Sequence, residues 1–253
     1  MRSVLDYPLA IFALAFAGQW LAAYLGYFLR TSRGRTQGAE QEDFATVLAA
    51  ALTLLGLIIG FSFSMSVNRY DLRKNYEEAE ANAIGTEYMR ADLLPSAEAA
   101  HLRDVLSKYL QQRLDFYLLR DEGRLQQINL ETDRIQNQLW SIVLGPAMAQ
   151  PTPVAALAVA GMNDVLNSQG YTQAAWWNRI PPAAWGLMGL VAIACNVLLG
   201  YCQRHPSRAR LIVLPMIVAV SFCLIADIDS PRGGLIRVVP QNLVALSQTF
   251  KPN

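Results

Sequence analysis

Hydrophobic residues along the chain gather in four blocks, which cover residues 9–29, 44–67, 183–202 and 211–226. A helix rises about 1.5 Å per residue, so crossing a hydrocarbon core of about 30 Å takes about 20 apolar residues. The first three blocks have this length, and the fourth reaches it by extending to Ile228. Tyrosine and tryptophan residues lie near the block ends, as they do at lipid headgroups. The pattern predicts four membrane-spanning helices.

The polar sequence between the second and third blocks predicts a water-soluble insert made of helices. Residues 68–94 are expected to continue the second span into water as one long helix. Ser96 is the expected N-cap of the next helix, and a further helix follows Gly123. A small-residue helix is expected over 154–167, after a run of helix breakers. The breakers are Gly145, Pro146, Pro151 and Pro153.

Helical spacing also predicts which faces of the insert are buried. On the helix over 68–94, the predicted buried stripe is Tyr76, Ala79, Ala83 and Tyr88. On the following helix, it is Leu102, Val105, Leu106, Tyr109, Leu110, Arg113 and Tyr117. Glu77, Glu78 and Glu80 share the first helix with alanines, which is typical of a solvated face and argues against an acid/base role.

The predicted fold is an all-α membrane protein, with a helical bundle inserted between the second and third of four transmembrane helices. Residues 1–67 hold the first two spans, 68–180 the water-soluble domain, 181–229 the last two spans and 230–253 a C-terminal tail. Pro240 is expected at the first position of a short helix in this tail. The first block lacks a small-residue cleavage site, so we expect a retained span in a multi-pass protein of the cell inner membrane.

Arginine placement leaves the orientation of the insert open. An even number of spans puts both termini and the insert on the same side of the membrane. The short loops on the other side carry Arg30, Arg33, Arg35, Arg204, Arg208 and Arg210. The positive-inside rule then favours an extracytoplasmic insert. A comparable set of basic residues lies near the spans on the insert's own side: Arg2, Arg69, Arg73, Lys74, Arg179, Arg232 and Arg237.

Composition removes several classes of function. The net charge is +1 and no dense basic run is present, so a nucleic-acid partner is not expected. The two histidines, His101 and His205, are not paired at metal-ligand spacing, and phosphate-binding loops and nucleophile elbows are absent from the sequence. Cys195, Cys202 and Cys223 fall in or beside apolar blocks, where cysteine behaves as a small hydrophobic residue. We therefore expect no enzyme activity, no metal and no cofactor.

A stripe of small and polar residues runs down the second block, at spacings of three or four. It consists of Thr53, Gly56, Gly60, Ser64 and Asn68. Small residues let helices approach closely in lipid, so the stripe is either a packing face or the water-contacting wall of a pore. Similar stripes are Gly18, Ala22 and Gly26 in the first block and Ala192, Asn196 and Gly200 in the third. Three such faces favour a tightly packed bundle or an oligomer.

Two acids, Asp227 and Asp229, directly follow the fourth block. An acid this close to hydrocarbon normally has a partner or contacts water. Arg232 and Arg237 are the nearest basic candidates along the chain. These four residues predict either a structural tie at the membrane surface or a ring that attracts ions.

Three stretches resemble the bestrophin-like membrane proteins of bacteria. They are LLGLIIGFSFSMSVNRYDLRKNYEEAEANAIGTEYMRADLLP, WWNRIP and IADIDSPRGGLIRV. The resemblance covers nearly the entire chain and includes the order of the four spans. Bestrophin channels share a Gly-Phe then Arg-aromatic pattern that leaves the second span and an acidic turn after the last one. The corresponding residues here are Gly60, Phe61, Arg69 and Tyr70, then Ile228, Asp229, Ser230, Pro231 and Gly233.

The resemblance implies a homo-oligomer, pentameric in bestrophins, that lies in the lipid bilayer and conducts inorganic anions. It places the stripe from Thr53 to Asn68 on the pore, with Phe61 or Phe63 as a hydrophobic constriction, and the insert in the cytoplasm, against the positive-inside rule. The tandem tryptophans of bestrophins are missing after Arg69, and their acidic calcium cluster is absent, so calcium gating is not implied. The alternative is a membrane-anchored interaction or sensing module without transport activity.

Overall fold

The protein is described by a computed structural model that covers residues 4–33, 38–120, 122–203 and 208–250. Regular structure in these ranges is helical. The two short 3-10 helices are η1 (Val4–Asp6) and η2 (Ala91–Leu93). The α-helices are α1 (Pro8–Arg33), α2 (Gly38–Arg90), α3 (Ser96–Leu118), α4 (Glu122–Ala149), α5 (Pro153–Trp177), α6 (Pro182–Cys202), α7 (Arg208–Asp229) and α8 (Gln241–Thr249).

Four segments of the described chain are long and apolar enough to cross a membrane, as the hydrophobic blocks predict. They are Pro8–Ser32, Asp43–Leu93, Pro153–Cys202 and Leu211–Asp229. The last shows that α7 continues past the fourth block to Asp229, with Pro215 inside the helix. The prediction of four apolar spans in an all-helical chain is therefore confirmed.

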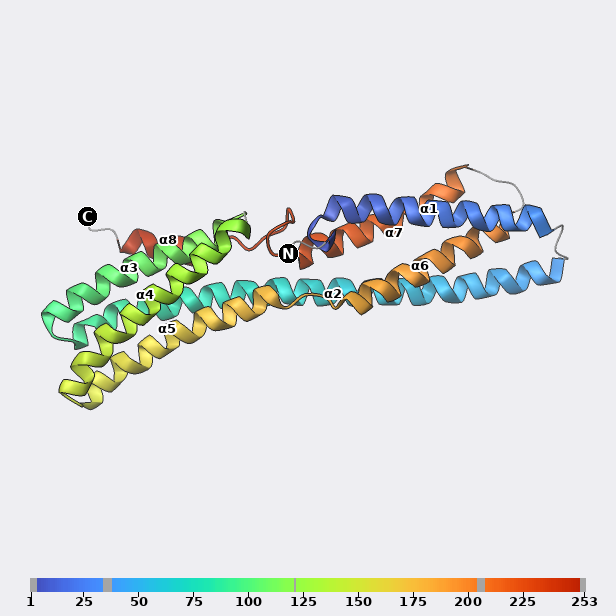
Figure 1. Cartoon of the computed structure of the whole chain (residues 1–253). Helices are drawn as coiled ribbons and strands as arrows, with labels where there is room; N and C mark the ends of the chain where they lie inside the picture. The colour runs from blue at the N-terminus through green and yellow to red at the C-terminus, as the bar shows by residue number, and fades with distance from the viewer. Residues whose placement is uncertain (1–3, 34–37, 121, 204–207, 251–253) are drawn as a thin grey trace. The chain divides into compact units, whose positions relative to one another are not determined.

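The helices divide into two compact units. The first contains the residues up to Arg69 together with Arg179–Arg237. In it, α1 packs along both α6 and α7 (Figure 1). Its apolar core includes Met188 and Cys195 of α6 and Phe222 of α7. The first unit is therefore built from the hydrophobic blocks themselves.

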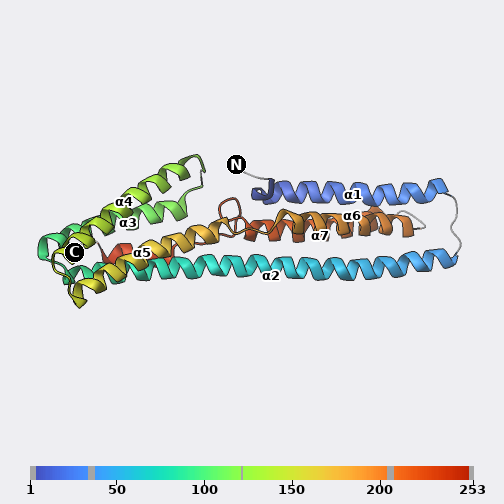
Figure 2. The same cartoon turned by 60° about the horizontal axis from the view of Figure 1, so that its bottom comes forward.

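The second unit contains Tyr70–Asn178 and Val238–Asn253, so the C-terminal helix α8 belongs to it. Within this unit α3 packs on α4, α4 on α5, and α8 on α3 (Figure 2). Its core includes the buried side chains of Tyr109, Leu139 and Met162. The buried face predicted for the helix at 96–118 is confirmed, because all seven of its residues are buried.

Several predicted helix ends are wrong by a few residues. Ser96 is the first residue of α3, with Pro95 at the cap position and no side-chain cap bond. Likewise α8 begins at Gln241, after Pro240 rather than on it. In both cases proline stands just before the helix, where its fixed φ suits the entry and its missing N–H is not required.

The breakers between α4 and α5 act later than predicted. Helix α4 runs through Gly145 and Pro146 to Ala149, so Pro146 stands inside the helix, where it has no N–H for the carbonyl one turn earlier. Helix α5 starts at Pro153 and continues to Trp177, ten residues beyond the predicted end at Asn167. The Thr152 hydroxyl accepts a bond from the Ala155 amide at 3.1 Å and caps α5.

Candidate functional site

The stripe predicted on the second span lies on an uncovered face of α2. Thr53, Gly56, Gly60, Ser64 and Asn68 are all exposed within the chain. A Cβ added at Gly56 or at Gly60 would meet no atom within 4 Å. The stripe is therefore not a packing face inside a single chain.

The opposite face of α2 is the covered one. Leu48, Leu55, Ser62 and Ser66 are buried there, and the Ser66 hydroxyl donates to the Ser62 carbonyl at 2.9 Å. At 100° per residue, the centre of this face lies about 150° around the helix from the centre of the stripe. Only 6% of the most apolar window of α2 is buried, against 50% of that of α7. Most of the second span is therefore not covered by other residues of the chain.

The stripes on the first and third spans are packed against each other. Ala22 and Gly26 of α1 and Asn196 and Gly200 of α6 are all buried. A Cβ on Gly26 would lie 2.8 Å from the Val197 carbonyl carbon, so only glycine fits this crossing. Gly18 is the exception, because a Cβ there would meet nothing within 4 Å. These two stripes are thus used inside the chain, in contrast to the stripe on α2.

One polar contact lies inside this helix pair. The Asn196 side-chain amide donates to the Gln19 side-chain oxygen at 3.1 Å and to the Ala192 carbonyl at 2.8 Å. Both side chains are buried, at 0% and 2% exposure. A hydrogen bond between polar side chains in a span stabilises the helix contact and fixes its register.

A cluster of charged residues ties together the end of the first unit that carries Asp229. The Arg179 guanidinium donates to Asp229 from Nε at 3.0 Å and to Asp6 from Nη1 at 2.7 Å. The Ile180 amide also donates to Asp229, at 3.2 Å. Asp229 is only 2% exposed, so its charge requires these partners. Sequence reasoning named Arg232 and Arg237 instead of Arg179, because they are near along the chain.

Asp227 is bound by backbone amides rather than by an arginine side chain in the hydrogen bonds seen here. Its two carboxylate oxygens accept from the amides of Leu235 and Ile236 at 2.7 and 2.8 Å. This folds the segment after α7 back onto the helix end. Gly234 sits in the turn, where a Cβ would lie 3.0 Å from the Asp227 carboxyl carbon. Asp227 therefore has a structural partner in the chain itself.

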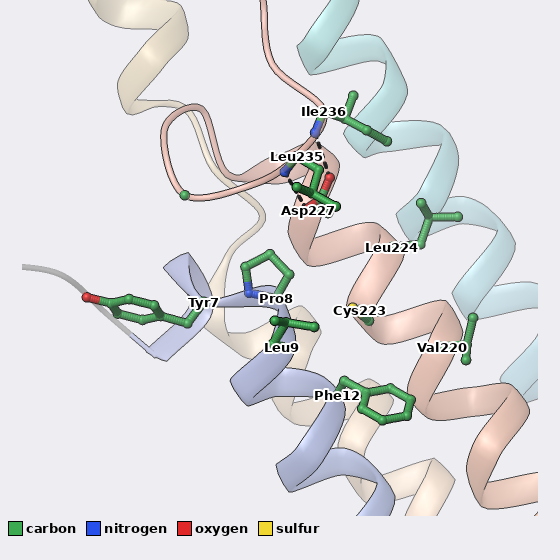
Figure 3. Close-up of a pocket in the computed structure, with 11 residues that line it drawn as sticks. Tyr7, Pro8, Leu9, Phe12, Val220, Cys223, Leu224, Asp227, Leu235 and Ile236 are labelled. Carbon is green, nitrogen blue, oxygen red and sulfur yellow. Dashed lines mark hydrogen bonds between the residues drawn. The ribbon is translucent and has the colours of Figure 1, made fainter. Parts of the chain in front are cut away.

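An apolar groove of ≈ 520 Å³ lies beside this turn, between α1 and α7 (Figure 3). Pro8 and Phe12 line it from α1, and Val220 and Leu224 line it from α7. Asp227 is the one charged residue on its wall, and the dashed lines in Figure 3 show both of its oxygens bound to amides. The groove thus presents hydrocarbon rather than ionic groups.

Glu77 and Glu80 of α2 are buried in the second unit, so the prediction of a solvated face is wrong for these two residues. Glu80 is fully buried and forms an ion pair with Arg113, while Tyr117 and Thr172 donate to its second oxygen at 3.2 and 3.1 Å. Glu78 is exposed as predicted. The Arg113 guanidinium also lies 4.4 Å from the Phe116 ring centre.

Glu77 holds the C-terminal helix. Its oxygens accept from the Leu243 amide at 2.9 Å and from the Asn242 side chain at 2.7 Å. A carboxylate at a helix N-terminus satisfies free amides and interacts favourably with the helix dipole. The burial of Glu77 at 2% exposure therefore serves the docking of α8. The predicted buried stripe is wrong for Ala79, which is exposed, whereas Tyr76 is half-buried and Ala83 and Tyr88 pack against the core of the unit.

No group of three or more metal-ligating side chains occurs among the described residues. In the described part of the chain, Cys195, Cys202 and Cys223 are thiols outside any disulfide. His101 lies on the surface of α3, where its Nε2 is 3.4 Å from the Gln138 side-chain nitrogen. His205 lies outside the described residues.

Comparison with known proteins places this architecture in a family. Residues 9–243 match the bestrophin-like domain. Crystal structures of a bacterial bestrophin homologue from Klebsiella pneumoniae have the same fold. A tryptophan-to-alanine variant of it gives a TM-score of 0.65 at 16% identity, covering 99% of this chain and 96% of that one. The structure phased on zinc gives 0.60 at 17% identity, covering 96% and 95%. No curated protein matches the chain.

The match extends from the first span to α8 and thus takes in both units. With four apolar helices in the described residues, it shows a multi-pass membrane protein, in agreement with the sequence resemblance. The chain belongs to the bestrophin-like family.

Proposed function

We propose that the protein is an oligomeric ion channel in which α2 helices from several subunits surround the pore. The observation that carries the proposal is the direction of the stripe from Thr53 to Asn68, which faces away from the rest of its own chain. One helix cannot enclose a pore, so the stripe lines one only when several chains assemble. The resemblance to bestrophins implies five subunits.

Two aromatic residues stand beside the stripe at its middle. Phe61 is 65% exposed and Phe63 is 39% exposed. At 100° per residue, they lie about 80° to either side of the centre of the stripe. A small rotation of α2 brings one of them toward the axis, and a ring of such side chains narrows a pore and favours its dewetting. Phe61 and Phe63 are therefore the proposed constriction.

The chemistry of the stripe supports conduction of inorganic anions. It carries no acidic side chain, and Ser64 and Asn68 have hydrogen-bond donors. Backbone at the open glycines allows close approach of an ion. The acids Asp227 and Asp229 are already engaged by amides and by Arg179. We assign these two acids, with Arg232 and Arg237, to a structural tie at the membrane surface.

The proposal also covers location and organisation. The chain resides in the cell inner membrane, with spans within 1–67 and 181–229 and a water-soluble domain over 68–180. The lipid bilayer and further copies of the chain are its partners, and no cofactor is required for passive conduction.

A membrane-anchored interaction module is the second candidate, and one surface favours it. A groove of ≈ 700 Å³ lies between α4 and α5 in the second unit. Leu144 and Met148 line it and are 38% and 74% exposed. Exposed apolar residues outside the membrane are typical of a protein-binding surface. This candidate predicts intact protein without current.

Ser64→Arg tests the channel, with Ser62→Arg as its matched control. Ser64 is exposed on the stripe, whereas Ser62 is 6% exposed on the covered face two residues away. A charge on a dry contact in a span costs at least about 2.5 kcal/mol, but a charge in water costs little. Ser64→Arg is expected to assemble and to shift the reversal potential toward greater anion preference in planar bilayers. Ser62→Arg is expected to lose folded protein.

Wild-type oligomers that pass no current in chloride across voltage, pH and salt would remove the channel proposal. A folded Ser62→Arg protein beside an unfolded Ser64→Arg protein would reverse the assignment of the two faces. Cation rather than anion selectivity of the wild type would refute the proposed selectivity alone.

A further inference from the structure

Three glutamates on α2 are buried in the second unit, and they differ in what they bind. Glu77 accepts hydrogen bonds from the start of α8, and Glu80 forms an ion pair with Arg113. Glu87, which lies two turns beyond Glu80, is 0% exposed, and neither of its carboxyl oxygens has a hydrogen-bond partner. Because Glu87 is already buried in the single chain, association with further chains would not expose it. Glu87 is therefore the buried acid that the fold does not explain by a bond.

The carboxyl of Glu87 lies against the backbone of α5. At Gly161 an added Cβ would meet the Glu87 Oε2 atom first, then Arg90 Nη1, and Arg90 Cδ at 3.0 Å. Gly161 is itself buried. The absence of a side chain at this position is what leaves room for the carboxyl between the two helices. Glu87 thus belongs to the α2–α5 contact rather than to a water-filled space.

The charged groups around this contact do not balance the charge of an ionised Glu87. Arg90, one turn later on α2, is the nearest positive charge to Glu87, and its Nη1 also donates to the Leu157 carbonyl at 3.3 Å. Asp164 faces the site from α5 and adds a second negative charge. On the adjoining η2, Asp92 is paired with Arg103 of α3 at 2.5 Å. Helix α8, which meets α2 at Gly85 through Leu246, contains no charged residue.

A carboxylate buried without hydrogen bonds is costly, and such a group binds a proton instead. Burial raises the pKa of Glu87 from its ordinary 4.5 to about 8, with Arg90 opposing the rise and Asp164 adding to it. At neutral pH the neutral acid then exceeds the carboxylate about tenfold. The protonated carboxyl costs less free energy to bury than the carboxylate does.

We propose that Glu87 is a proton-binding site, held as the neutral acid between α2 and α5, and that its ionisation at alkaline pH weakens this contact. The site is independent of whether the protein conducts ions. Its consequence for a channel is that pH acts on the same continuous helix that carries the stripe from Thr53 to Asn68. Release of one proton leaves one negative charge on Glu87, and no other reactant is needed.

The expected pH dependence follows from the two states of the chain. The native state binds the proton more tightly than the unfolded chain, whose carboxyl has the ordinary pKa of 4.5. Stability from this group is therefore fully present below about pH 4.5 and is lost as pH rises through about 8. Between about pH 6 and about pH 9, the unfolding constant is expected to rise by between about tenfold and about a hundredfold.

Glu87→Gln is the test, because it keeps the shape and removes the titration. Glu78→Gln, at an exposed glutamate of the same helix, is the matched control. The melting temperature of the purified full-length protein is measured across this pH range. Wild type and Glu78→Gln are expected to lose stability together as pH rises, while Glu87→Gln is expected to lose much less. Equal pH dependence in all three proteins would overturn the proposal.

Infrared titration of the wild type gives a second measurement that needs no variant to fold. The carbonyl stretch of a protonated, non-hydrogen-bonded carboxylic acid is expected to disappear with a midpoint near pH 8, and to be missing in Glu87→Gln. A wild-type spectrum without such a band at about pH 6 would refute a neutral Glu87 whatever the stability data show.

Discussion

Gly200→Ala is the sharpest test of how the spans are packed. An added Cβ at Gly200 would lie 2.8 Å from the Tyr27 amide nitrogen and closer still to the Ala23 carbonyl oxygen. Ordinary contact begins at 3.4 Å, so the Tyr27 nitrogen alone requires α1 and α6 to separate by about 0.6 Å, and the nearer Ala23 oxygen requires more. Both obstacles are backbone atoms, which cannot rotate away. The strain must therefore be distributed over the whole helix pair.

The same separation acts on the buried bond one turn away. The Asn196–Gln19 distance of 3.1 Å would grow to at least about 3.7 Å, beyond hydrogen-bond range. Overpacking of a core costs about 1–3 kcal/mol, and a polar contact between membrane helices about 0.6 kcal/mol. Alanine also gains about 1 kcal/mol of helix propensity, so we expect Gly200→Ala to destabilise the protein by roughly 1–3 kcal/mol in total. For a chain of this size, that lowers the melting temperature by roughly 2–12 °C.

Gly60→Ala is the matched control, because a Cβ at Gly60 meets nothing within 4 Å. Alanine is also the better helix former by about 1 kcal/mol. The control is expected to keep or raise the melting temperature of the detergent-purified protein, measured by loss of the native peak in size-exclusion chromatography after heating. If both variants lose stability equally, the stripe on α2 is a packing face and its assignment to a pore is wrong.

Two further predictions concern the second unit. Arg113→Met leaves the buried Glu80 carboxylate without its ion-pair partner and is expected to lower the free energy of unfolding in denaturant by about 3–5 kcal/mol. Adding Glu80→Gln should restore much of this loss, because the uncompensated charge is then removed. A double variant no more stable than Arg113→Met alone would contradict the reasoning. A cysteine at the exposed Gln126 reports the orientation of the insert. An impermeant thiol reagent labels it in intact cells if the insert is extracytoplasmic, as the positive-inside rule favours. Absence of labelling would favour a cytoplasmic insert, as the resemblance to bestrophins implies.

Local sequence was enough to predict the membrane spans and the buried face of α3. Twenty or so apolar residues have few alternatives to a membrane helix, because every backbone group must be satisfied within the segment. The buried face of α3, from Leu102 to Tyr117, follows equally from local spacing, since its apolar residues recur with the helical period. The stripe from Thr53 to Asn68 was visible as a pattern, but its two interpretations remained open.

Tertiary structure decided which stripes are used and which charges are buried. Gly26 lies against the Val197 backbone and Gly200 against the Ala23 backbone in the contact between α1 and α6, whereas space around Gly56 and Gly60 is open. Nothing in the local sequence separates these cases. Glu80 has its partners 33 and 92 residues away, and helical spacing cannot report contacts at that range.

The ends of the spans show the same limit. Sequence reasoning considered only the nearby Arg232 and Arg237 for Asp229 and missed its ion pair with Arg179, fifty residues earlier in the chain. Asp227 is bound by the backbone amides of the turn that follows α7, and the position of this turn depends on the tertiary structure. Hydrophobic periodicity is a local property, so the sequence determines helices and their apolar faces. A charge in a low-dielectric interior is stable only beside a partner, and the folded chain is needed to show which residue, distant in sequence, is that partner.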